Sequence, residues 1–106
     1  MAKYMFIASY TAEGAKGVLK EGGTGRREAV ATAMASAGGT MESFYFGFGS
    51  DDAYVVADFP DHASAAAAAL TVSATGTSRV RTVVLLTPEE IDQASKRTVD
   101  FRSPGD

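Results

Sequence analysis

The spacing of apolar residues divides the chain into four predicted strands and two main helices. Runs with apolar side chains in both phases of a pleat predict strands over residues 3–10, 40–48, 53–59 and 79–87. Apolar residues at helical spacing predict a long helical region after Thr11, which the glycine-rich stretch 22–25 breaks into a short and a longer part. A second helix is predicted from its N-cap, Asp61, to about Ala74.

A third, short helix is predicted from Thr87 to about Thr98. Thr87 and Glu90 have capping-box spacing, and Pro88 stands at the first helical position. We expect a single domain over residues 1–98, followed by a frayed tail over residues 99–106.

The order β-α-β-β-α-β is typical of a ferredoxin-like α+β fold, with a four-stranded antiparallel sheet and both main helices on one face. In each strand, alternate residues share one face of the sheet. The set that is purely apolar, such as Met5 with Ile7, is assigned to the helix side. The opposite face then receives Tyr4, Phe6, Tyr10, Glu42, Phe44, Phe46, Phe48, Tyr54, Val56, Asp58, Arg81, Val83 and Leu85. A face so rich in aromatic and aliphatic groups needs a partner sheet, a ligand or the third helix as its cover, and the leading prediction is a homodimer or higher homo-oligomer formed through the sheet.

Composition excludes several kinds of chemistry. The 106 residues are 45% hydrophobic and 22% charged, as in ordinary soluble domains. With no Cys there is no disulfide, thiolate nucleophile or cysteine-bound metal. The net charge of -3 does not favour nucleic acid as a partner, and no segment is long enough to span a membrane, so we expect a cytoplasmic protein.

Three local features have both a functional and a structural interpretation, and the structural one is favoured for each. His62 follows the Asp61 cap and has no evident orienting partner for general-base catalysis. The glycines of residues 22–25 lack the ending of a phosphate-binding loop. Asp51 and Asp52 fit turn chemistry better than a cation site, so no metal or cofactor is predicted.

A cluster of polar and aromatic residues on the face away from the helices is the main candidate site: Tyr4, Tyr10, Glu42, Tyr54, Asp58 and Arg81. In the favoured interpretation it is an interface where Arg81 pairs with Asp58 or Glu42. In the alternative, tyrosine hydroxyls and Arg81 orient a small molecule whose apolar part lies among Phe6, Phe44 and Phe46.

Several short motifs together resemble the GYD-domain family, small bacterial proteins with a dimeric α+β-barrel type of fold. The motifs are Tyr10-Thr11 with Gly14, Phe44-Tyr45, Gly49-Ser50-Asp51-Asp52, Pro60-Asp61 and Val80-Arg81-Thr82, within residues 4–90. Gly49 and Asp52 match the naming motif, while Asp51 stands where its Tyr is expected. The resemblance implies pairing through the sheet and no established reaction.

Two function classes remain open from the sequence. The first is a non-enzymatic, oligomeric binding or interaction module, in keeping with the absence of a nucleophile–base set. The second is a cofactor-free monooxygenase- or isomerase-like enzyme, in which Tyr10 or Tyr54 acts as acid, Asp58 as base and Arg81 as anion stabiliser. The module is the preferred hypothesis.

Overall fold

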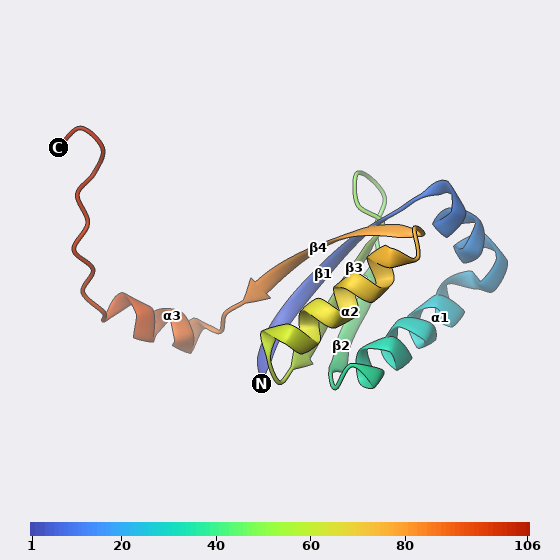
Figure 1. Cartoon of the computed structure of the whole chain (residues 1–106), viewed down its shortest axis with the longest axis horizontal. Helices are drawn as coiled ribbons and strands as arrows, with labels where there is room; N and C mark the ends of the chain where they lie inside the picture. Colours follow the sequence, from blue (N-terminus) through green and yellow to red (C-terminus); the bar gives the residue numbers. More distant parts are fainter.

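The computed structural model describes residues 1–106, and its four strands form one antiparallel sheet (Figure 1). The strand order is β2-β3-β1-β4. In chain order the elements are β1 (Ala2–Tyr10), α1 (Ala12–Ser36), β2 (Thr40–Phe46), β3 (Ala53–Phe59), α2 (His62–Ala74), β4 (Ser78–Leu85) and α3 (Pro88–Ser95). The predicted βαββαβ order with a short C-terminal helix is therefore confirmed.

Both main helices cover the same face of the sheet, as predicted. Met34 of α1 and Ala65 and Ala68 of α2 are buried against Val55 and Phe59 of β3. The opposite face, called the open face below, carries neither α1 nor α2 (Figure 1). No helix of the chain is both long enough and apolar enough to cross a membrane.

The helices begin at the residues that local chemistry predicts. Thr11, Asp61 and Thr87 each accept a hydrogen bond from a backbone N–H in the first turn of the helix that follows. The Thr87 hydroxyl and the Glu90 carboxylate complete the capping box of α3. The predicted break in α1 is at Gly22, where φ is 80° and ψ is 168°.

The predicted facing of β1 is wrong. Tyr4, Phe6 and Tyr10 lie on the helix side, and Met5 and Ile7 lie on the open face. The reason is side-chain size, because α2 presents alanines to the sheet and small residues leave room for large rings. Tyr4 and Phe6 fill that room with edge contacts to Phe59, at ring-centroid distances of 6.0 and 5.8 Å.

The predicted facing of β2 is also wrong for its aromatic residues. Phe44 and Phe46 pair in register with Val55 and Ala53, whose side chains face the helices. A β-bulge between Met41 and Ser43 adds one residue to β2. The extra residue, Glu42, turns to the open face, so Glu42 and Phe44 point to opposite sides despite their even spacing.

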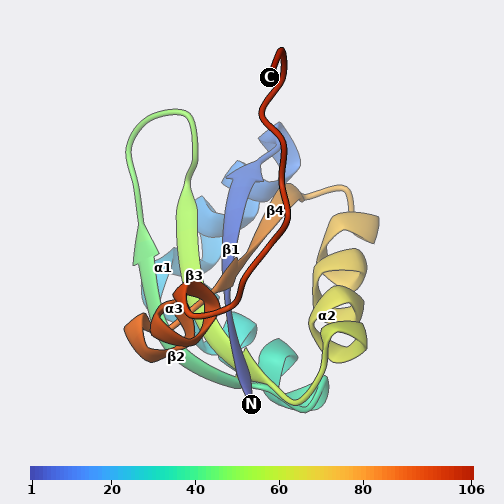
Figure 2. The same cartoon turned by 90° about the vertical axis from the view of Figure 1, so that its left-hand side faces the viewer.

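The C-terminal segment stands apart from the rest of the molecule. After β4 the chain runs past the end of the sheet, and α3 and the residues after it lie outside the layers formed by the sheet and the main helices (Figures 1 and 2). Leu86, Ile91, Val99 and Phe101 are all more than half exposed there. We call residues 86–106 the C-terminal arm.

Candidate functional site

One end of the open face is an ion-pair cluster centred on Lys3. Its ammonium group donates hydrogen bonds to the carboxylates of Glu42 and Asp58, the latter at 3.2 Å. The hydrogen bond to Glu42 raises the pKa of Lys3 above its ordinary value, and the hydrogen bond to Asp58 adds to this rise. With one positive and two negative groups, this end of the face is acidic.

The opposite end of the open face is held by the loop between β2 and β3, which stands out in Figure 2. Asp51 accepts hydrogen bonds from Arg81 at 3.1 Å and from the Ser9 hydroxyl at 3.0 Å. Asp52 accepts one from the backbone N–H of Tyr10 at 2.8 Å. The two aspartates therefore fasten the loop to the sheet, in agreement with the turn interpretation. Arg79 shares this end, because it pairs in register with Ser9.

Between the two ends, the open face is apolar. Met5, Ile7, Val56 and Val83 occupy its middle, and Tyr54 lies beside Ile7 in the sheet register. Ile7 is only 8% exposed, since Tyr54 and Arg81 flank it on the neighbouring strands. The open face is less aromatic than predicted, because Tyr4, Phe6, Phe44 and Phe46 lie on the other side.

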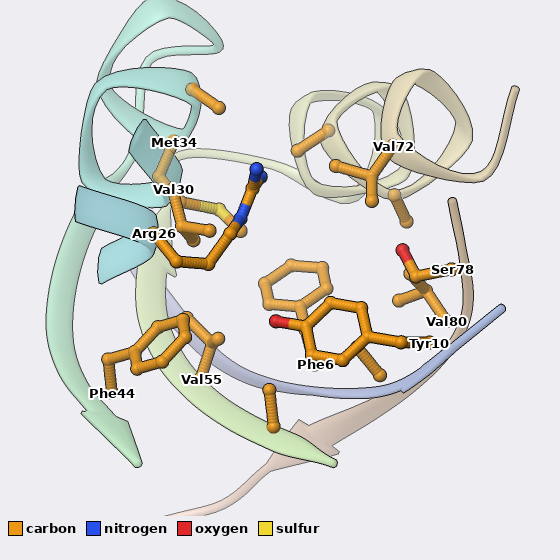
Figure 3. A pocket seen from close by; sticks show the side chains of 15 residues that line it. Phe6, Tyr10, Arg26, Val30, Met34, Phe44, Val55, Val72, Ser78 and Val80 are labelled. Atoms are coloured by element: carbon orange, nitrogen blue, oxygen red, sulfur yellow. The ribbon is translucent and has the colours of Figure 1, made fainter. Parts of the chain in front are cut away.

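A hollow opens on the helix side of the sheet, between α1 and α2 (Figure 3). Its cavity volume is about 60 Å³. All but two of its lining residues are apolar or aromatic: Phe6, Ala8, Tyr10, Arg26, Val30, Ala33, Met34, Phe44, Ala53, Val55, Ala68, Ala69, Val72, Ser78 and Val80. We call this space the helix-side hollow.

Arg26 and Tyr10 supply the main polar groups of the helix-side hollow. The Arg26 side chain extends across it, and the Tyr10 ring lies at its base with the hydroxyl directed inward (Figure 3). Burial raises the pKa of Tyr10; the positive charge of Arg26 opposes that rise, and the negative charges of Asp52 and Glu21 add to it. Tyr10 is therefore protonated near neutral pH and able to donate a hydrogen bond.

The break at Gly22 precedes the part of α1 that lines the hollow. After it, Arg26, Val30 and Met34 follow at four-residue spacing, which places all three on the side of the helix that faces the sheet. Arg26 also pairs with Glu21 across the break, at 3.2 Å. Arg26 is not among the site residues predicted from the sequence, although its spacing from Val30 and Met34 is the pattern that identifies it.

His62 has a partner that the sequence did not reveal. Its Nδ1 lies 2.6 Å from the hydroxyl of Tyr4, and the two rings meet edge to face. Tyr4 is 2% exposed, so this hydrogen bond satisfies a buried hydroxyl at the start of α2. The contact gives His62 a structural role on the helix side of the sheet.

The predicted cluster is thus split between the two faces. Glu42, Tyr54, Asp58 and Arg81 lie on the open face, whereas Tyr4, Tyr10, Phe44 and Phe46 lie on the helix side. The predicted pairing of Arg81 with Asp58 or Glu42 is wrong: Arg81 pairs with Asp51, and Lys3 takes both acidic groups. In the sheet register, Asp58 lies opposite Lys3 and Arg81 lies opposite Ile7. These two positions are about 13 Å apart along β1.

Comparison with known proteins identifies the family. No curated protein and no solved structure shows significant similarity to the chain. The GYD domain matches residues 4–95, which include all three helices and all of the sheet except the first two residues of β1. With nearly the whole folded chain matched, this protein belongs to the GYD domain family.

Proposed function

We propose that this protein is a non-enzymatic binding module that works as a homodimer, with the open faces of two sheets packed together. The observation that carries the proposal is the apolar middle of the open face, formed by Met5, Ile7, Val56 and Val83. No element of the chain covers it, since α1 and α2 lie on the other side and α3 stands beyond the end of the sheet (Figure 1). A second sheet would remove Met5, Val56 and Val83 from water, whereas Ile7 is already buried.

The charges at the two ends of the open face favour a second copy as the cover. The Lys3 end has one positive and two negative groups. The Arg81 end has two positive groups, Arg79 and Arg81, and two negative groups, Asp51 and Asp52, and Arg79 is in no ion pair. A two-fold axis running across the strands would bring the acidic Lys3 end of one copy onto Arg79 of the other.

The C-terminal arm supports the same arrangement. Ile91 of α3 is 51% exposed and Leu86 is 56% exposed, although the capping box defines the helix well. Glu89, Glu90 and Asp92 make this helix acidic. The negative charge of this helix is complementary to the positive charges of Arg79 and Arg81 on the edge strand of a neighbouring copy, and contact there would also cover its apolar side.

The enzyme hypothesis has less support from the geometry. Of its candidate groups, Tyr10 lies on the helix side, while Tyr54, Asp58 and Arg81 lie on the open face. Asp58 and Arg81 are also engaged by Lys3 and Asp51 at opposite ends of the sheet. Acid, base and anion stabiliser therefore do not surround one common space.

Sedimentation equilibrium of the purified chain at micromolar concentration tests the proposal. We expect twice the mass of a single chain for the wild type and a single-chain mass for Val83→Asp, because a charge in the middle of the interface is not tolerated. Leu70→Asp is the matched control, since Leu70 is 69% exposed on α2, and it should stay dimeric. A monomeric wild type, or equal behaviour of the two variants, would rule the proposal out.

A further inference from the structure

We propose that the helix-side hollow binds a small amphipathic acid, with its apolar part between the helices and its carboxylate held by Arg26 and the Tyr10 hydroxyl. The hollow and the open face lie on opposite sides of the sheet. Ligand binding and dimerisation are thus separate proposals, and either can fail without the other.

The walls of the hollow select an apolar ligand body. Val30, Val72 and Val80 approach from three different elements, and the rings of Phe6 and Phe44 lie beneath them (Figure 3). The alanines of α2 widen the space, because a methyl group fills less of it than a larger side chain would. The hollow therefore suits a short alkyl chain or a single aromatic system.

The polar groups in the hollow select an anion. Arg26 is the only charged lining residue, and its side chain is 33% exposed. Its pair with Glu21 uses one terminal nitrogen, which leaves further N–H donors for a carboxylate. No carboxylate is among the lining residues, and Glu21, the ion-pair partner of Arg26, lies outside the lining, so Arg26 is the charged group that a ligand in the hollow would meet.

Tyr10 adds a second donor that favours a carboxylate. Its backbone N–H is bonded to Asp52 at 2.8 Å, which holds the end of β1 and the start of the side chain in place. The hydroxyl, protonated at neutral pH, then points into the hollow. A carboxylate accepts from both Arg26 and Tyr10, whereas an alcohol offers no charge to Arg26.

The first test compares octanoate with octan-1-ol by isothermal titration of the full chain. The two ligands have the same number of carbon atoms and differ in the head group, so the comparison tests the carboxylate without changing the protein. We expect octanoate to bind about tenfold or more tightly than the alcohol. 2-Naphthoate in a parallel titration distinguishes an aliphatic from an aromatic ligand body.

Variants then locate the site. Arg26→Met should weaken octanoate binding about tenfold or more and leave octan-1-ol binding unchanged. Arg27→Met, at the exposed neighbouring position, is the matched control and should bind octanoate like the wild type. Tyr10→Phe should weaken octanoate binding severalfold, and Ala69→Leu should weaken both ligands by filling the hollow.

Three results would overturn the proposal. They are no binding of octanoate or 2-naphthoate at millimolar concentration, equal affinity for acid and alcohol, and equal loss of octanoate binding in Arg26→Met and Arg27→Met. Circular dichroism of each variant separates loss of the site from loss of the fold. The ligand comparison in the wild type remains valid whatever the variants do.

Discussion

At the scale of single residues, Gly14 shows how closely the start of α1 approaches the turn before β4. A Cβ at Gly14 would lie 2.0 Å from the carbonyl oxygen of Thr77 and 3.1 Å from the ring of Tyr10. The same Thr77 carbonyl accepts a hydrogen bond from the backbone N–H of Thr11 at 2.9 Å. Only glycine allows this approach, which also sets the position of the Tyr10 ring in the helix-side hollow.

We predict that Gly14→Ala lowers the free energy of unfolding by about 2 kcal/mol, because the added methyl group collides with backbone that cannot move freely. Gly17→Ala, in the same part of α1 with nothing near its Cβ, is the control. It should be neutral or stabilising by up to about 1 kcal/mol, since alanine favours the helix. Urea denaturation of both variants checks the prediction, and similar midpoints would contradict it.

At the scale of elements, the break in α1 separates the first part of the helix, where Gly14 packs against Thr77, from the part that lines the hollow. Gly22 has a φ of 80° and a ψ of 168°, a conformation essentially confined to glycine. The turn it makes brings the backbone at Gly23 close to the ring of Phe46, which a Cβ would approach to 3.1 Å. Arg26 then begins the next turn of helix over the sheet.

We predict that Gly22→Ala lowers the free energy of unfolding by about 1–3 kcal/mol, owing to backbone strain. Gly25→Ala is the control, because its Cβ would make only an ordinary contact with Glu21 at 3.7 Å. Thermal unfolding followed by circular dichroism distinguishes the two. A Gly22→Ala variant as stable as Gly25→Ala would mean that α1 accommodates the change by straightening.

At the scale of the whole molecule, the sheet separates two different surfaces. The open face combines an apolar middle with an acidic end at Lys3 and an end where Arg79 and Arg81 lie beside Asp51 and Asp52, and the helix side carries a hollow with one cation. The C-terminal arm extends the molecule to a longest dimension of 55 Å (Figure 1). The two proposals use different surfaces: the proposed dimer forms through the open face, and the proposed ligand binds on the helix side.

If unlike ends of the open face meet in the proposed dimer, raising the salt concentration should weaken dimerisation. Added salt shortens the range over which the Lys3 end and the Arg81 end attract each other. We expect a severalfold larger dimer dissociation constant by sedimentation in high salt, and a further increase for Arg81→Glu in low salt. Dimerisation that strengthens with salt would instead indicate contact through the apolar middle alone.

Local chemistry made much of the fold predictable. The caps at Thr11, Asp61 and Thr87 and the break at Gly22 depend on residues within a few positions of each other. Among the strands, β3 lies at residues 53–59 as predicted, whereas β2 and β4 each end two residues earlier than predicted. Once these elements are placed in order, few topologies remain, and the ferredoxin-like one follows.

The facing of the strands and the make-up of the hollow were decided only by tertiary packing. Both phases of β1 are apolar enough for burial, and the alanines of α2 select the phase of Tyr4 and Phe6 because they leave room for rings. The bulge in β2 turns Glu42 toward Lys3, a partner far away in the sequence. Arg26 meets Tyr10 only after α1 has bent over the sheet, since such contacts depend on the sizes and positions of residues on other elements.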